Sequence, residues 1–256
     1  MKVLLAGETF LATTSVAVGG DTITNTGWSN GALAFNAAMA AAGIAVTQIG
    51  GEHCGTDFPR TLAELAEFDA VILSDVGALT LLITPDARDG KVGPNRLELL
   101  KTYVAAGGGL MLAGGYMGFQ GMFGTARFAD TAVEDVLPVR CLPYSDGLEV
   151  PEGLVATLLQ PTHPILAGID EPLPPILGLN KLDFRGDDAS CLLGVCQYRG
   201  KDWPLLAVRS YGQGRSVIWS TDIGPHWLSR DFLEWSLYGT LMANIVRWIC
   251  QTDTTP

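Results

Sequence analysis

Short apolar runs alternate with segments of helical periodicity in the first half of the chain. Each run is nearly continuous, which is typical of strands that are buried on both faces of a parallel sheet. The predicted strands are residues 3–6, 45–49, 70–74 and 109–113. The predicted helices between them are residues 31–42, 61–67 and 96–106. Ser29 or Asn30 is expected to cap the first helix. This order predicts an α/β fold in which helices cover a mostly parallel central sheet.

The second half of the chain is richer in strand patterns. Residues 192–198, 204–210 and 216–220 predict strands, and Gly212-Gln213-Gly214 predicts a tight turn between the last two. Residues 233–250 predict a terminal helix with one broad apolar face. Gly and Pro never cluster as a linker, so we expect a single domain over residues 1–252, followed by a disordered tail over 253–256.

Two connections in the first half are long enough to need a reason. Residues 8–30 follow the first strand, and their pattern predicts a small hairpin with strands at 15–18 and 22–24. Residues 76–94 follow the third strand. Both connections leave the carboxyl ends of strands, where open α/β sheets bind their ligands. A packing role or an oligomer contact explains either connection equally well.

Composition and charge exclude several classes of partner. Apolar residues make up 48% of the chain and charged residues 17%, so a sizeable core can form. The net charge of −11 repels phosphate backbones and anionic membrane surfaces, so we expect no nucleic-acid and no membrane partner. Residues 22–51 carry no charge, but polar residues and glycines interrupt them, so no membrane span is expected.

The spacing of the cysteines and histidines also argues against disulfide bonds and against a metal site. The five cysteines form no CxxC pair, which is typical of a reduced, cytoplasmic protein. The three histidines form no HxH or HExxH motif, so neither a metal site nor a cofactor is expected. His163 precedes Pro164, and we interpret it as a structural turn residue.

The turn after the fourth predicted strand carries the most functional information. The strand leads into Gly114-Gly115-Tyr116-Met117-Gly118-Phe119-Gln120, whose glycines suit a sharp turn from a strand into a helix. In hydrolases and amidotransferases such a turn holds a nucleophile in a strained backbone, and its N–H groups form an oxyanion hole. Tyr116 stands where that nucleophile would project.

This turn resembles the nucleophile elbow of the class I glutamine amidotransferase-like superfamily, which reads G-x-C-x-G-x-Q. Gly114, Gly118 and Gln120 match that pattern. Residues 69–75, 162–168 and 211–215 are similar to a divergent branch that includes trehalose-utilisation-type proteins. The resemblance spans roughly residues 2–250. It implies a flavodoxin-like three-layer α/β fold with additional β-hairpins in the second half.

The chain departs from this family at the residues that carry the chemistry. The family uses a cysteine thiolate, whereas Tyr116 offers a phenol with an ordinary pKa near 10. The family histidine follows a late strand and has an acid two residues further on. His226 fits the first condition, but the residue two beyond it is Leu228. Asp222 or Asp231 is left to orient His226. Glutamine hydrolysis is therefore not expected.

The fold brings a set of candidate residues to the carboxyl ends of the strands. We predict acid–base roles for His226, Tyr116, Asp75 and Glu8; together with His53, these residues are also compatible with binding of a divalent ion or a polyol. The predicted binding residues are Gly115, Gly118, Gln120, His53, Cys54, Asp222 and Trp227. Each has a structural alternative, since Glu8 and Asp75 can bind backbone N–H groups, His53 can be a solvated turn residue, and Trp227 can cover the core.

Three functions are compatible with these residues. The first is a protein without glutaminase activity that binds a small polar metabolite near Tyr116 and His226. The second is a hydrolase or isomerase of a sugar-like metabolite that uses His226 with a carboxylate. The third is a component of a homo-oligomeric assembly. A deep polar pocket with His226 beside a carboxylate would favour the enzyme, and a pocket filled by Tyr116 would favour the other two.

Overall fold

A computed structural model describes residues 1–252 of the chain. Its central feature is an eight-stranded sheet in the order β4-β1-β5-β6-β14-β13-β12-β9. The parallel part consists of β4 (Ala45–Ile49), β1 (Lys2–Gly7), β5 (Ala70–Ser74), β6 (Gly109–Ala113) and β14 (Gly214–Trp219). The antiparallel part consists of β13 (Lys201–Tyr211), β12 (Ser190–Tyr198) and β9 (Ala156–Leu158). The predicted α/β fold with a mostly parallel sheet is confirmed.

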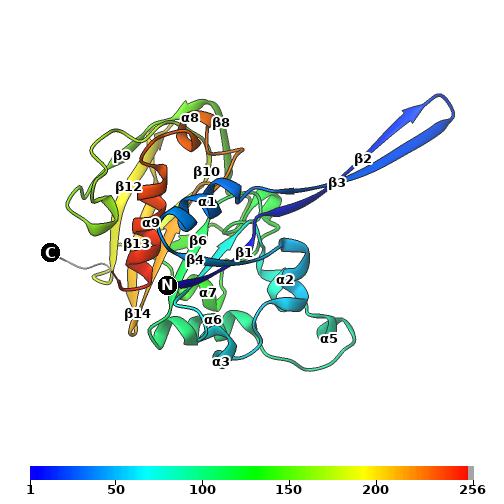
Figure 1. Cartoon of the computed structure of the whole chain (residues 1–256), viewed down its shortest axis with the longest axis horizontal. Helices are drawn as coiled ribbons and strands as arrows, with labels where there is room; N and C mark the ends of the chain where they lie inside the picture. The colour runs from blue at the N-terminus through cyan, green and yellow to red at the C-terminus, as the bar shows by residue number, and fades with distance from the viewer. Residues whose placement is uncertain (253–256) are drawn as a thin grey trace.

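Helices cover both faces of the sheet (Figure 1). Strand residues alternate between two cores, because successive side chains of a strand point to opposite faces. Val3 and Leu5 pack with α1 (Leu33–Ala41) and α9 (Tyr238–Ile249). Leu4 packs on the other face with α6 (Arg96–Ala105). The remaining helices are α2 (Gly51–Asp57), α3 (Leu62–Leu65), α4 (Ala78–Leu82), α5 (Pro85–Arg88), α7 (Ala132–Val136) and α8 (Arg230–Leu233).

The second half of the chain adds two small antiparallel pairs. Strand β8 (Gly147–Leu154) pairs with β10 (Ile176–Asn180), and β7 (Val139–Cys141) pairs with β11 (Leu182–Phe184). Two 3₁₀ turns, η1 (Met122–Gly124) and η2 (Pro164–Leu166), lie in the connecting loops. The additional hairpins expected for the second half are formed by consecutive antiparallel strands of the central sheet, β12 with β13 and β13 with β14.

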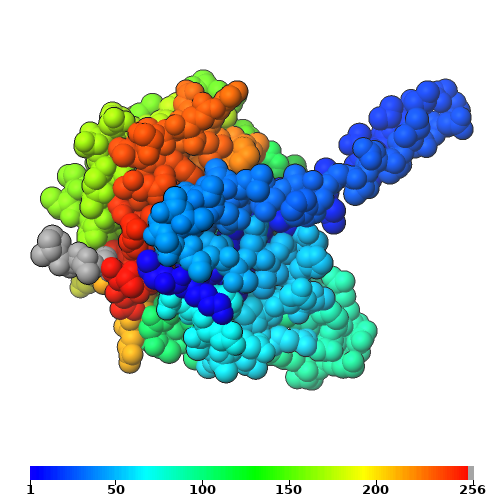
Figure 2. All heavy atoms as spheres, in the orientation of Figure 1, coloured from blue at the N-terminus to red at the C-terminus, as the bar shows by residue number. Residues whose placement is uncertain are grey.

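The first long connection forms a much larger hairpin than the sequence predicts. Strands β2 (Thr9–Val18) and β3 (Asp21–Asn30) have ten residues each and pair along their whole length. This hairpin, called the arm below, projects from the body of the molecule (Figures 1 and 2). The strands extend beyond the predicted ends because the added segments, residues 9–14 and 25–30, contain Thr, Phe and Trp, which favour extended backbone.

Several other boundaries differ from the prediction. The first helix begins two residues later, and its N-cap is Ala32 rather than Ser29 or Asn30, although the Asn30 Oδ1 atom accepts from the Ala32 N–H. The predicted terminal helix corresponds to α9, which begins at Tyr238, five residues later than predicted, and the short α8 precedes it. Residues 253–256, predicted to be a disordered tail, lie outside the described residues. No helix within residues 1–252 is both long and apolar enough to cross a membrane.

Candidate functional site

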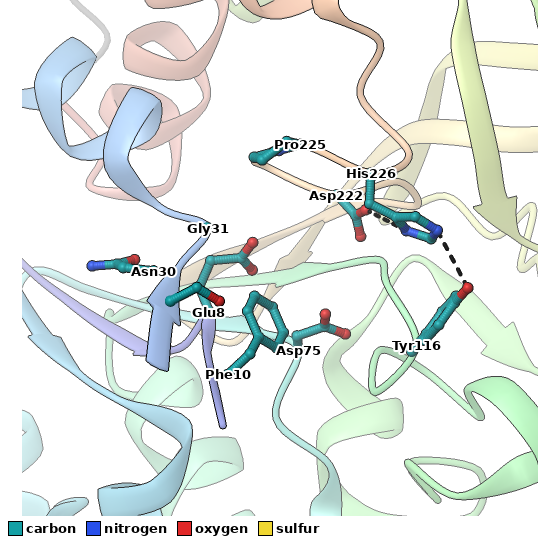
Figure 3. A pocket seen from close by; sticks show the side chains of 10 residues that line it. Glu8, Phe10, Asn30, Gly31, Asp75, Tyr116, Asp222, Pro225 and His226 are labelled. Atoms are coloured by element: carbon teal, nitrogen blue, oxygen red, sulfur yellow. Dashed lines mark hydrogen bonds and ion pairs between the residues drawn. The ribbon is translucent and has the colours of Figure 1, made fainter. Parts of the chain in front are cut away.

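Four neighbouring parallel strands deliver the candidate residues to one edge of the sheet. In the order of the sheet, β1 is followed by Glu8, β5 by Asp75, β6 by the turn with Tyr116, and β14 by Asp222 and His226. All five line a single cavity of about 480 Å³ (Figure 3). The other lining residues are Phe10, Ser29, Asn30, Gly31 and Pro225. This volume is within the range of about 300–1,000 Å³ that small-molecule pockets occupy.

Three of these residues adopt a backbone conformation that side chains other than glycine rarely take. The φ angles are 60° at Glu8, 47° at Asp75 and 109° at His226. Such conformations cost of order 1–3 kcal/mol each and persist only where the surrounding structure imposes them. Their concentration around one cavity is typical of a functional site, because strain is retained where it aims a side chain.

The turn after β6 differs from the predicted elbow in two ways. It is followed by η1 rather than by an α-helix. The left-handed backbone falls on Gly115, with φ of 125°, so the strain that was predicted at Tyr116 is taken by the glycine before it. A Cβ atom at Gly115 would collide with carboxylate oxygens of Asp75 and Asp222. Gly115 therefore permits both acids to lie close to Tyr116.

Two backbone N–H groups of this turn already have partners. The Gly115 N–H donates to Asn180 Oδ1 at 3.0 Å, and the Met117 N–H donates to Asp75 Oδ1 at 2.8 Å. The N–H of the residue after a nucleophile is a usual donor of an oxyanion hole. Because Asp75 occupies that donor, the turn does not present a free oxyanion hole at this position.

A chain of polar contacts crosses the mouth of the cavity. The His226 Nδ1 atom lies 3.3 Å from Asp222 Oδ2, and His226 Nε2 lies 3.3 Å from the Tyr116 hydroxyl. The Tyr116 hydroxyl donates to Glu149 Oε1 at 3.0 Å. The ring edge of Tyr116 meets the imidazole at a centroid distance of 4.8 Å. Of the two acids that the sequence left open, Asp222 is the one beside His226.

The charges around His226 favour its protonated form. A hydrogen bond to Asp222 raises the pKa of His226, and Glu149 and Asp75 act in the same direction. An imidazolium donates from both nitrogens, to Asp222 and to the Tyr116 oxygen, while Tyr116 donates to Glu149. Burial and the Glu149 carboxylate raise the pKa of the Tyr116 phenol. Tyr116 is therefore a neutral hydrogen-bond donor and acceptor rather than a nucleophile.

Two carboxyl groups, the buried Glu8 and the partly buried Asp75, form the floor of the cavity. The Ser74 hydroxyl donates to Glu8 Oε2 at 2.6 Å. Burial, together with the Asp75 carboxylate, raises the pKa of Glu8 to about 8. Burial, together with the Asp222 carboxylate, raises the pKa of Asp75 to about 7. Near neutral pH these groups exchange protons readily and can each donate or accept a hydrogen bond.

Two of the predicted binding residues lie outside the cavity. His53 and Cys54 are on α2, which the sequence analysis treated as a turn. The His53 side chain is exposed to solvent, and Cys54 is buried, with its thiol donating to the Ile49 carbonyl. Burial raises the pKa of Cys54 to about 12, so it does not supply a thiolate. Neither residue is among those that line the cavity.

Three further predicted residues support the turn and its surroundings from behind. Gly118 lies against the end of β6, where a Cβ would meet the Ala113 carbonyl. The Gln120 Oε1 atom accepts from the Ala129 N–H at 3.4 Å. Trp227 is fully buried, and its indole packs on Gly178. The interpretation of Trp227 as a cover for the core fits this position better than contact with a ligand.

His163 caps η2 through its ring, as expected of a turn residue.

The residues that hold the turn in place were missed by sequence analysis. The Asn180 side-chain amide donates two hydrogen bonds, to the Gly115 carbonyl at 3.2 Å and to Asp146 Oδ1 at 2.8 Å. Asp146 accepts from the N–H groups of Gln120 and Gly121, each at 2.9 Å. Both residues are fully buried. An apolar run that ends in Asn, as in Leu179-Asn180, was the available signal.

No group of His, Cys, Asp and Glu among the described residues has the arrangement of a metal site. Glu8, Asp75 and Asp222 do surround one end of the cavity, but each has protein partners. The Ser74 hydroxyl binds Glu8, the Met117 N–H binds Asp75, and His226 binds Asp222.

The structure combines a parallel sheet with a Gly-Gly-x-x-Gly turn at its carboxyl edge. That turn faces a histidine and an acid that follow the last parallel strand, β14. This combination is typical of proteins of the glutamine amidotransferase type. The comparison with protein families agrees, since the family described as "Putative glutamine amidotransferase" (GATase1-like) matches residues 2–251. The chain belongs to this family.

Two solved structures resemble the chain over nearly its whole length. Cytoplasmic protein STM3548 from Salmonella typhimurium is 31% identical, with a TM-score of 0.91 over 97% of this chain and 99% of that one. Cytoplasmic protein STM1381 from Salmonella typhimurium LT2 is 32% identical, with a TM-score of 0.90 over the same shares.

More distant structures share the fold alone. A cold-adapted β-galactosidase from Rahnella sp. R3 is 13% identical, with a TM-score of 0.52, and the match covers 86% of this chain but only 26% of that enzyme. The search of curated proteins gave no match.

Proposed function

We propose that the chain is a glutamine amidotransferase-like protein that lacks glutaminase activity and binds a small polar metabolite in the cavity at the carboxyl edge of the sheet. The observation that carries this proposal is the position of Tyr116. It stands in the turn where the family places its nucleophile, and its hydroxyl lies 3.3 Å from His226 Nε2. A phenol whose pKa is raised replaces the thiolate that amide hydrolysis requires.

The chemistry of the lining restricts the class of ligand. The described residues that line the cavity include three carboxyl groups but no lysine or arginine. Among the described lining residues His226 is the one cationic side chain, and its imidazole is already bound to Asp222, so the lining favours a neutral or cationic ligand over an anionic one. Asn30, Ser29 and the protonated forms of Glu8 and Asp75 offer both donors and acceptors. This set suits hydroxyl or amine groups, so we propose a polyol, a sugar or an amine as the ligand.

A thermal-shift screen of the purified protein against sugars, polyols, amino acids and amines tests this proposal. A ligand present at 100 times its dissociation constant adds about 2.7 kcal/mol to the free energy of unfolding, which gives a clear shift in Tm. The same screen on His226→Ala should lose the hit, and His53→Ala, whose side chain lies on α2 outside the cavity, should keep it. A hit that survives in His226→Ala would contradict the proposed site.

A second candidate is favoured by the contacts between Asp222, His226 and Tyr116. An acid–base pair within hydrogen-bond reach of a cavity can move protons during hydrolysis or isomerisation of a sugar-like metabolite. Turnover of a compound found in the screen, with a rate that falls as His226 loses its proton, would establish this enzyme function. Binding without turnover would leave the first proposal.

The proposal has three further parts, which concern the family branch, the cellular location and the partners. We place the chain in the branch of the family that includes trehalose-utilisation-type proteins. We place it in the cytoplasm, which agrees with the names of the two Salmonella proteins and with its reduced cysteines. We propose that it needs no cofactor and has no nucleic-acid or membrane partner.

A further inference from the structure

The arm is an exposed and almost uncharged element attached to an acidic body. Between Thr9 and Asn30 the only charged residue is Asp21, at the turn, whereas the whole chain carries a net charge of −11. Nearly every residue of the arm is exposed. Figure 2 shows that the arm projects away from the other atoms of the body.

Large apolar side chains occupy both faces of the arm. Residues paired directly across an antiparallel ladder share a face. The Val16–Ile23 pair lies on one face, with side chains that are 52% and 61% exposed. The Leu11–Trp28 pair lies on the other face, with 61% and 58% exposed. Val18, which is 55% exposed, lies on the same face as Val16 and Ile23, so these three side chains form a contiguous exposed apolar surface, and such a surface marks an interaction site.

An arm of this kind is expected to be covered. A single two-stranded hairpin is marginally stable in water. Within the described residues, β2 and β3 pair only with each other, so their outer edges keep unpaired N–H and C=O groups. Only the root is anchored to the body, where the Trp28 indole donates to Glu52 Oε1 at 2.9 Å and the Thr9 hydroxyl donates to Glu52 Oε2.

The body exposes two aromatic side chains, Phe123 and Tyr144, on segments that are linked to each other. Phe123, in η1, is 85% exposed, and Tyr144 is 59% exposed. The two segments are joined by a hydrogen bond from the Phe123 N–H to Ser145 Oγ at 3.0 Å. Tyr116, which lines the cavity, is also 43% exposed and leads into this loop. The root of the arm contributes Phe10, Ser29 and Asn30 to the lining of the same cavity.

We propose that the arm docks on the Phe123–Tyr144 patch of a second copy of this chain, and that the second copy returns the same contact. With ten residues in each strand, the arm provides about as many residues as one side of a standard protein interface, which contains about 20–30. A reciprocal contact doubles this and closes as a two-fold dimer. Because the arm carries only one charge, it can approach the acidic body of the other copy without strong repulsion. The proposed contact places the arm of each copy beside the cavity of the other.

Sedimentation velocity over a range of protein concentrations tests the dimer. Val16→Lys/Ile23→Lys places two charges on one face of the arm, where neither side chain supports the body. The matched control is Val92→Lys/Val155→Lys, since both valines are exposed on the body and the charge change is the same. We expect wild type and control to dimerise and the arm variant to dimerise about 100-fold more weakly or not at all.

A mixing experiment tests the docking site itself. Phe123→Lys/Tyr144→Lys should also be monomeric. In a mixture of this variant with the arm variant, each mixed dimer retains one intact arm-to-patch contact, so dimers should reappear. A monomeric wild type, or an arm variant that dimerises as well as the control, would overturn the proposal. A patch variant that remains dimeric would also overturn it, because the arms would then pair with each other.

Discussion

Glu8 and Asp75 combine a left-handed backbone with a carboxyl group that has little contact with solvent. The backbone places each side chain over the end of its strand, and burial disfavours the charged form. Each carboxyl also raises the pKa of its neighbours, since Asp75 acts on Glu8 and Asp222 acts on Asp75. The charge of the cavity is therefore set by three acids together and changes around neutral pH.

This arrangement predicts how stability depends on pH. Between the unfolded pKa of 4.5 and the folded pKa of about 8, Glu8 holds more proton in the folded chain than in the unfolded chain. The free energy of unfolding must therefore fall as pH rises through this window. Asp75 acts in the same direction up to about pH 7, and so does His226, whose raised pKa stabilises only the protonated folded state.

Tm measured from about pH 5 to about pH 8.5 should decrease, and Glu8→Gln should flatten the decrease because the amide does not titrate. Glu152→Gln, which replaces an exposed carboxyl, should leave the wild-type slope unchanged. A Glu8→Gln profile that follows the wild type would mean that this carboxyl does not stay protonated in the folded chain.

Restoring a thiol at the turn should not restore glutaminase activity. In Tyr116→Cys, the Met117 N–H still donates to Asp75 and is not free to stabilise an oxyanion. Loss of one such donor costs about 10²–10³ in rate. Ammonia release from glutamine should be no faster in Tyr116→Cys than in Tyr116→Ser, which has no thiol. Faster release from the cysteine variant would show that the oxyanion site is intact.

At the scale of elements, the turn after β6 depends on a strand that is far away in the sequence. Asn180, at the end of β10, binds both the N–H and the carbonyl of Gly115 and also contacts Asp146. Asp146 in turn holds two N–H groups of the loop beyond Tyr116. The second half of the chain therefore fixes the geometry of a turn that belongs to the first half.

Removal of this bridge should destabilise the protein. Asn180→Ala leaves the buried Gly115 N–H without a partner and removes one of the hydrogen bonds of Asp146, and an unsatisfied buried group costs about 1–3 kcal/mol. Urea unfolding should show this loss, whereas Asn25→Ala, at an exposed position of the arm, should change stability by less than about 0.5 kcal/mol. Equal effects of the two substitutions would contradict the bridging role of Asn180.

At the scale of the whole molecule, the body and the arm have different sources of stability. The body has two cores on opposite faces of the sheet. The arm contributes no residue to either core, and its strands contact mainly each other. The body should therefore fold without the arm, while the arm needs a partner to cover its apolar residues.

Replacement of residues 11–28 by a short Gly-rich turn should separate these two contributions. At low concentration, the shortened chain should unfold at nearly the same temperature as the monomeric wild type, because no core residue is lost. The wild-type Tm should rise with protein concentration as dimers form, and that of the shortened chain should not. A shortened chain that is unfolded at all temperatures would show that the arm supports the body.

The sequence by itself determined the sheet, the layer order and the strands that lead into the site, because buried parallel strands need continuous apolar runs whatever follows them. It also predicted a sharp turn after β6, since the glycines around Tyr116 match the family's turn motif. It did not predict the helix α2, which carries His53 and Cys54, or the length of the arm, which depends on pairing between strands.

Only the tertiary structure decided which acid accompanies His226, which N–H groups of the turn are already bound, and which carboxyl groups retain protons. These properties depend on distances between residues such as Asp75 and Met117, or Asn180 and Gly115, that are far apart along the chain. Burial and proximity to other charges set a pKa, and neither is encoded in the local pattern of residues. The chemistry of the cavity therefore belongs to the packed molecule, whereas the scaffold that carries it can be predicted from the sequence.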